Sequence, residues 1–127
     1  MNEQAATQAN ILSLRLKHGW EIRLSKAALE ALGKPGYVRF LWSAEQRVLL
    51  VEAAEADTPQ SLRVSSVNYQ RGGSIPFRNH SFIEAVLKLT QWKRDYIYTV
   101  QGEYLPKLDM VAFEIKKAIQ EEVPSNE

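Results

Sequence analysis

The segment Trp20–Val51, WEIRLSKAALEALGKPGYVRFLWSAEQRVLLV, decides the predicted fold, because residue types mark each change of secondary structure in it. It begins at 20–24 with alternating apolar and polar residues, which is typical of a strand with one buried face. The Ala- and Leu-rich run 26–32 favours a helix. The apolar runs 37–42 and 47–51 predict two strands joined by a hairpin turn.

The ends of this helix are marked as clearly as its interior. Ser25 is placed to cap the first turn, because its hydroxyl can accept a hydrogen bond from an otherwise unpaired amide. Gly33 suits the left-handed conformation that commonly ends a helix, and Pro35 cannot continue one. The helix is therefore short, about two turns long. Its apolar face is formed by Ala28, Leu29 and Leu32.

Outside this segment, the chain divides into one domain and two tails. Residues 1–10 are polar and lack the pattern of a signal peptide, so we expect a disordered lead-in. Residues 11–16 alternate and predict a further strand. Residues 53–61 contain Pro59 and show no periodicity, which indicates a linker. We expect a single domain over 11–118 and a flexible tail over 119–127.

The second half of the chain repeats the order of the first. A helix capped by Asn79 or Ser81 should run to Leu89. A loop holding Gly102 and Pro106 should join the last two strands. The predicted strands of this half are 62–67, 75–77, 96–100 and 110–115, and a short helix is expected over 116–123.

Short strings also match between the halves, which supports an internal repeat. Ile22–Leu24 corresponds to Ile75–Phe77, and Tyr37–Phe40 resembles Tyr96–Thr99. One half alone is too small to bury its apolar faces, whereas two facing copies would cover each other. We therefore predict an α+β, mainly β fold of two tandem strand–helix–hairpin repeats. The repeats are 11–54 and 62–118, the linker is 55–61, and the chain is a monomeric pseudo-dimer or a homodimer.

The first half resembles the AbrB-like, swapped-hairpin family of bacterial transition-state regulators and antitoxins. The resemblance is carried by Ile22–Lys26, Leu29, Leu32-Gly33, Val38, Phe40 and Val48–Val51. Two copies in one chain are similar to the tandem arrangement of the MraZ proteins. The resemblance implies a swapped-hairpin β-barrel. It also implies DNA binding through arginines near the first strands and the start of the helix.

Bulk composition limits the classes of protein to consider. The chain has 127 residues, 45% of them hydrophobic, which suits one globular domain with its own core. It has no cysteine, so a disulfide, a thiolate metal site and a cysteine nucleophile are excluded. Its apolar runs are far shorter than the ~20 residues that cross a bilayer. We expect a cytoplasmic protein without a membrane partner.

The charge of the chain is unevenly distributed. The net charge is +1, but residues 11–118 contain all 16 basic residues and only 11 of the 15 acidic ones, which leaves the body at +5. A basic body is suited to binding a polyanion, although an ordinary solvated surface can have the same excess of basic residues. Six basic residues are candidates for phosphate contacts: Arg15, Lys17, Arg23, Lys26, Arg71 and Arg78.

Other chemistry finds little support in the sequence. Arg71-Gly72-Gly73-Ser74 could cradle a phosphate, but it lacks the P-loop spacing and a plain tight turn explains it as well. His18 and His80 have no regular spacing to carboxylates, so no metal site is expected. Trp20 and Tyr69 flank turns and remain open as base-stacking residues. We expect no enzyme activity and no cofactor.

Two functions follow from these observations. The first is a DNA-binding transcriptional regulator or antitoxin-like protein that contacts duplex DNA through the six basic residues. The alternative is a protein–protein interaction or assembly module that kept the fold and lost the DNA contacts. Leu29-Glu30 in the helix and the near-neutral overall charge favour the alternative, since DNA binders of the family that the chain resembles often carry basic residues there.

Overall fold

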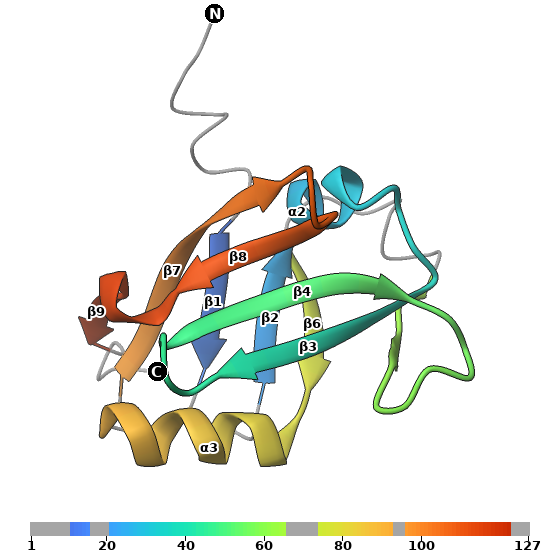
Figure 1. Ribbon diagram of the computed structural model, residues 1–127. Helices are drawn as coiled ribbons and strands as arrows, with labels where there is room; N and C mark the ends of the chain where they lie inside the picture. Colours follow the sequence, from blue (N-terminus) through green and yellow to red (C-terminus); the bar gives the residue numbers. More distant parts are fainter. Residues whose placement is uncertain (1–10, 16–20, 66–73, 93–95, 123–127) are drawn as a thin grey trace, which may run out of the picture.

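The computed structural model describes residues 11–15, 21–65, 74–92 and 96–122, and it is mainly β (Figure 1). The predicted mainly-β class is confirmed. The elements in chain order are β1 (Ile11–Arg15), β2 (Glu21–Ser25), α2 (Lys26–Ala31), β3 (Tyr37–Ser43), β4 (Val48–Ala54), β5 (Leu62–Arg63), β6 (Ser74–Arg78), α3 (His80–Thr90), β7 (Tyr96–Leu105), β8 (Met110–Glu114), the 3-10 helix η2 (Ile115–Lys117) and β9 (Ile119–Glu122).

The strands form one curled antiparallel sheet in the order β5-β3-β4-β8-β7-β1-β2-β6, with β9 also beside β7. The ten-residue β7 connects two parts of this sheet. Its first part pairs with β1 and β9, and its last four residues pair with β8. Among the described residues no ladder joins β5 to β6, so the sheet is open along that seam.

Four ladders join the halves of the chain: β1–β7, β2–β6, β3–β5 and β4–β8. In the β2–β6 ladder the middle pair is Arg23 opposite Pro76. In the β4–β8 ladder the middle pair is Leu50 opposite Ala112. These contacts join residues far apart in sequence. Neither half therefore has a sheet of its own, which makes the described residues one structural unit.

The core lies on the inner face of the curled sheet. Alternate residues of each main strand point inward, and those of β2, β4 and β8 are completely or almost completely buried. The two helices cover opposite ends of the curl (Figure 1). Near the open seam the packing is aromatic: the ring centroids of Phe40 and Phe77 lie 5.5 Å apart, and those of Phe40 and Phe82 lie 6.0 Å apart.

Both helices begin at the predicted capping positions. Ser25 Oγ accepts a hydrogen bond from the Ala28 amide at 3.3 Å. For α3 the cap is Asn79, whose Oδ1 accepts from the Phe82 amide at 3.0 Å, and Ser81 lies within the helix. Gly33 has the positive φ of +88° expected just after the end of α2.

One predicted loop is a strand. The sequence placed Gly102 in a loop, but β7 continues through it to Leu105. Gly102 pairs with Phe113 in the β7–β8 ladder. A Cβ on Gly102 would lie 2.6 Å from Phe113 Cδ1, so the glycine makes room for the ring. The sequence analysis took this glycine as a sign of a turn, whereas in the structure it permits close packing.

The predicted helix over 116–123 is wrong. The chain forms the short 3-10 helix η2 and then β9, which pairs with Tyr96–Thr99 of β7. The physical reason is the free edge of β7 before β8 begins to pair with it, since unpaired strand groups favour a partner strand. Residues 119–122, assigned to the tail by the sequence, belong to this strand. The strand predicted over 62–67 is limited to Leu62–Arg63 in the described part.

Candidate functional site

The predicted basic residues lie around the β2–β6 ladder. Arg23 occupies the middle of β2, between the buried Ile22 and Leu24, so its side chain is on the outer face. Its Nε donates to Ser74 Oγ at 2.8 Å. Its Nη1 also lies 3.4 Å from Glu21 Oε2. Its Nη2 donates to the Ser74 carbonyl oxygen at 3.4 Å, so the guanidinium is already engaged by a carboxylate, a hydroxyl and a carbonyl.

The other predicted basic residues are dispersed. Arg78 is exposed and stands opposite Glu21 at one end of the ladder, while Lys26 begins α2 beyond the other end. The backbone of Arg15 in β1 also pairs opposite Glu21. Lys17 and Arg71 lie outside the described residues, as do Trp20, Tyr69 and His18. The structure therefore groups Arg23 and Arg78 on one ladder with an acid between them.

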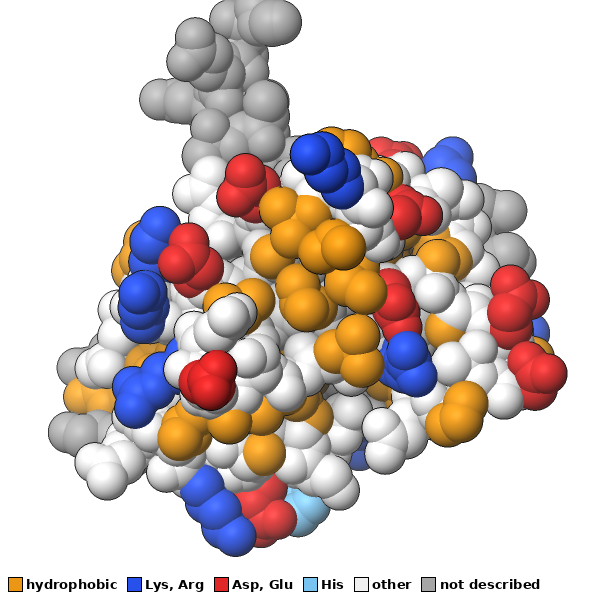
Figure 2. All heavy atoms as spheres, in the orientation of Figure 1, with side chains coloured by type: hydrophobic (Ala, Val, Ile, Leu, Met, Phe, Trp, Pro, Cys, Tyr) orange, Lys and Arg blue, Asp and Glu red, His pale blue; other side chains and the backbone are white. Residues whose placement is uncertain are grey.

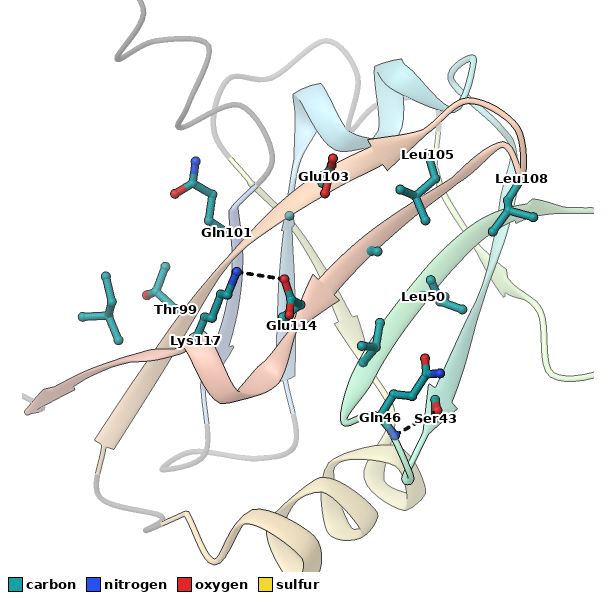
Figure 3. A pocket seen from close by; sticks show the side chains of 14 residues that line it. Ser43, Gln46, Leu50, Thr99, Gln101, Glu103, Leu105, Leu108, Glu114 and Lys117 are labelled. Atoms are coloured by element: carbon teal, nitrogen blue, oxygen red, sulfur yellow. Dashed lines mark hydrogen bonds and ion pairs between the residues drawn. The ribbon is translucent and has the colours of Figure 1, made fainter.

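A groove of about 650 Å³ lies on another part of the sheet, over β8 and between β4 and β7 (Figure 3). Figure 2 shows apolar side chains gathered over these strands. Part of its lining consists of apolar side chains that face outward, namely Val48, Leu50, Leu105, Leu108, Ala112 and Ile119, and the rest is mostly polar or charged. Sequence reasoning missed this groove.

The groove exists because a small residue lies between larger ones. Ala112 is the outward-facing residue in the middle of β8. Its neighbour across the β4–β8 ladder is Leu50, and its neighbour across the β7–β8 ladder is Glu103. The two larger side chains form walls, and the alanine forms the floor. Leu105 and Leu108 close the end near the β7–β8 turn (Figure 3).

The apolar residues of the groove include the most exposed ones described. Leu108 is 59% exposed and Ile119 is 70% exposed, and these are the large hydrophobic residues left exposed in the described part of the chain. A scattered exposed leucine is ordinary, but several around one groove indicate a contact surface. A signal was present in the sequence: Val48–Val51 is apolar without alternation, so both faces of β4 are apolar.

The charges around the groove are mostly paired. Lys117 Nζ lies 2.9 Å from Glu114 Oε2. The hydrogen bond from Lys117, with its positive charge, lowers the pKa of the Glu114 carboxyl below its ordinary 4.5. Glu103 is exposed on the β7 wall and forms no ion pair with any residue that the structure describes. The local excess charge is therefore one carboxylate.

A second hollow of about 620 Å³ lies at the open seam, between β3 and the start of α3. Trp42 and Phe82 form part of its wall, with ring centroids 6.0 Å apart. Arg78 and His80 are at its rim. This hollow brings one predicted basic residue next to aromatic rings, but it contains neither Arg23 nor Lys26.

The described part of the chain contains neither a cluster of metal ligands nor a membrane-spanning helix. Within 11–15, 21–65, 74–92 and 96–122, no three His, Asp or Glu residues are grouped as metal ligands. No helix of the described ranges is long and apolar enough to cross a membrane. Comparisons of the chain with protein-family models, curated proteins and solved structures gave no match. The resemblance to the AbrB-like family stays a prediction.

Proposed function

We propose that the chain is a non-enzymatic interaction module that binds a protein partner in the groove over β8. The observation that carries this proposal is the outward-facing apolar lining, with Leu108 and Ile119 more than half exposed. Leaving such side chains in water is unfavourable by ~25 cal/mol per Å² of apolar surface. A partner that covers them gains that free energy on binding.

An in-cell crosslink tests this function directly. A photo-crosslinking amino acid is placed at Ala112 in the groove floor, and a matched one at Pro76 on the outer face of β6. We expect a discrete adduct of one partner from position 112 and none from position 76. Equal adducts from both positions, or none from 112, would contradict the proposal.

Duplex DNA binding remains a second proposal, supported by a different surface. Arg23 and Arg78 occur on neighbouring strands, and Lys26 follows β2 directly. Against a high affinity stands the contact of Arg23 with Glu21, because DNA phosphates must displace that carboxylate. Phosphate contacts of this kind weaken steeply as salt rises.

Fluorescence anisotropy with random duplex DNA at two salt concentrations tests the second proposal. We expect binding at low salt that falls at higher salt. Binding should also be lost in the double variant Arg23→Glu with Arg78→Glu. The single variant Glu21→Ala removes the carboxylate that pairs with Arg23 and should strengthen DNA binding. No binding at low salt, or a double variant that binds equally, would remove DNA from consideration.

We also propose that two related halves make up the fold, as a cytoplasmic monomeric pseudo-dimer. Two of the four ladders between the halves, β2–β6 and β4–β8, have the middle pairs Arg23–Pro76 and Leu50–Ala112, which supports a twofold relation between the halves. Both hairpins have four-residue loops, and the last loop residue has a positive φ in each: 55° at Arg47 and 52° at Asp109. Analytical ultracentrifugation should give the 14.5 kDa mass of a single chain.

A further inference from the structure

We infer that the groove over β8 receives an amphipathic α-helix of another protein, with a lysine or arginine of that helix beside Glu103. This inference rests on the proposed function and names the shape and charge of the partner. It follows from the backbone pairing under the groove, the width of the groove and the charges on its walls.

The backbone beneath the groove is already paired. β8 is joined to β4 on one side and to β7 on the other, so the groove lies on a sheet face and not at an edge. An extended peptide gains affinity by hydrogen bonding to an unpaired edge, which this face does not offer. A helix satisfies its own backbone groups internally and needs only side-chain contacts. The face therefore selects a helix over a strand.

The dimensions agree with this choice. The two walls are β4 and β7, with β8 between them. Neighbouring strands lie about 4.8 Å apart, so the backbones of β4 and β7 are about 10 Å apart across β8, and one helix can lie over this face with its apolar side chains in the groove. Five residues of β8 span about 17 Å, a length that a helix covers with about 12 residues.

The charges around the groove indicate the sign of the charge on the partner. Glu114 is neutralised by Lys117 at 2.9 Å, and the polar residues beside them in the lining, Ser43, Gln46, Thr99 and Gln101, are uncharged. Glu103 on the β7 wall is the described lining residue that keeps an uncompensated charge. A basic residue on the edge of the bound helix complements it.

The helices of a second copy of this chain do not fit the requirement. α2 has six residues, and its Ala28 and Leu29 are buried in the core. α3 has eleven residues, and its apolar face, with Phe82, Ile83 and Val86, is buried as well. Neither described helix has a free apolar face to place in the groove of another copy. The described helices of a second copy therefore do not supply the bound helix, and we assign it to a different protein.

In the test, peptides that bind the intact protein are selected from a displayed library of random 16-residue peptides. The affinity of the recovered peptides is then measured. Leu50→Asp places a charge in the groove wall. Leu41→Asp is the matched control, because Leu41 faces outward directly across the β3–β4 ladder and does not line the groove. Thermal unfolding of both variants must show the same folded state before binding is compared.

We expect peptides that bind the wild type and Leu41→Asp but not Leu50→Asp. Their apolar residues should recur at positions i, i+3 or i+4, and i+7, and circular dichroism should show helix forming on binding. Glu103→Gln should weaken binding about two- to fivefold, the range for an exposed ion pair, and Glu103→Lys should weaken it further.

The possible failures are distinguishable. If no recovered peptide depends on Leu50, both the inference and the proposed function are overturned. If Leu50-dependent peptides bind without becoming helical, the helix is overturned and a groove-binding partner remains. If binding is indifferent to Glu103→Lys, the inferred charge of the partner is wrong. A concentration-dependent dimer that Leu50→Asp abolishes would assign the groove to a second copy instead.

Discussion

The hairpins β3–β4 and β7–β8 have the same backbone plan but distribute their core volume in opposite ways. Each has a four-residue loop, and in each the fourth ladder pair from the loop faces the core. In the first hairpin that pair is Phe40 opposite Val51, and in the second it is Gly102 opposite Phe113. The large ring is on the first strand of one hairpin and on the second strand of the other.

The core therefore constrains the summed volume of a ladder pair more than the residue at either position. Interiors are packed to crystal-like density, so a ring on one strand requires a small residue opposite it. Phe113 is fully buried and Phe40 is 8% exposed. The second hairpin therefore fits more tightly, and substitutions there should be felt more strongly.

The largest expected effect is the loss of unfolding free energy in Phe113→Ala, which should exceed the loss in Phe40→Ala. Truncating a buried phenylalanine typically costs about 3–5 kcal/mol of unfolding free energy. Phe113→Ala should lie at the upper end, because Gly102 opposite has no side chain that can relax into the cavity. Phe40→Ala should cost less, since its edge is near the open seam and Val51 remains opposite. Urea unfolding of the two variants measures the difference.

A larger loss of unfolding free energy in Phe40→Ala than in Phe113→Ala would contradict this prediction, because it would mean that the first hairpin is packed more tightly. Phe40→Leu and Phe113→Leu are the matched conservative pair. Both should retain more stability than the alanine variants, in the same order.

The next effect is overpacking by Gly102→Ala, expected to cost about 1–3 kcal/mol. The added methyl group would lie 2.6 Å from Phe113 Cδ1, so the ring or a strand must shift. Gly36→Ala is the control within the same chain, because a Cβ there meets no atom within 4 Å and its φ is not positive. Gly36→Ala should be neutral or slightly stabilising, since it restricts the unfolded chain. Chemical denaturation of both variants gives the values.

A double-variant cycle sharpens this prediction. Gly102→Ala combined with Phe113→Leu should lose less stability than the two single changes added together, because the smaller side chain leaves room for the methyl group. Additive losses would mean that the steric contact with Phe113 is not the cause of the Gly102→Ala effect.

The comparison of hairpins also explains how far the fold could be predicted from the sequence. Helix caps at Ser25 and Asn79 were found, because a capping residue acts on amides two or three residues away. The sequence match of Tyr37–Phe40 with Tyr96–Thr99 pairs Phe40 with Thr99. In the structure, the residue of the second hairpin that has the position of Phe40 is Gly102, three residues further on. Residue similarity could not find this position, because the two hairpins exchange large and small residues across the ladder.

The candidate site was less predictable than the fold. The six basic residues were chosen by charge, but whether a guanidinium is free depends on cross-strand neighbours such as Ser74, 51 residues from Arg23. The groove depends on which strands become neighbours, and β8 lies between β4 and β7 only in the folded sheet. The sequence contained its clearest signal in the apolar run Val48–Val51, which local periodicity could assign to a strand but not to a groove.

A smaller effect is expected from the helix caps, where the two halves differ in hydrogen-bond length. Asn79→Ala removes the 3.0 Å bond to the Phe82 amide and should cost about 1 kcal/mol. Ser25→Ala removes the longer 3.3 Å bond to Ala28 and should cost less. Asn79→Asp keeps an acceptor and should retain the stability. Thermal unfolding by circular dichroism ranks the three, and a destabilised Asn79→Asp variant would argue against capping as the cause.

The smallest effect concerns the loop of the second hairpin and its dependence on pH. Tyr104 donates its hydroxyl proton to Asp109 Oδ1 at 2.7 Å, and this bond, followed by desolvation and the negative charge of Asp109, raises the pKa of Tyr104 above 10.0. A pKa that is higher in the folded state than in the unfolded one adds stability below the unfolded pKa, and that stability is lost as pH rises through the folded pKa. Tyr104→Phe should therefore be slightly less stable than the wild type at neutral pH, and the gap should narrow above pH 10. Asp109→Asn should return the pKa of Tyr104 toward 10.0 in an ultraviolet titration of tyrosinate, with Tyr104→Phe identifying its contribution. An unchanged Tyr104 pKa in Asp109→Asn would show that this bond does not form in solution.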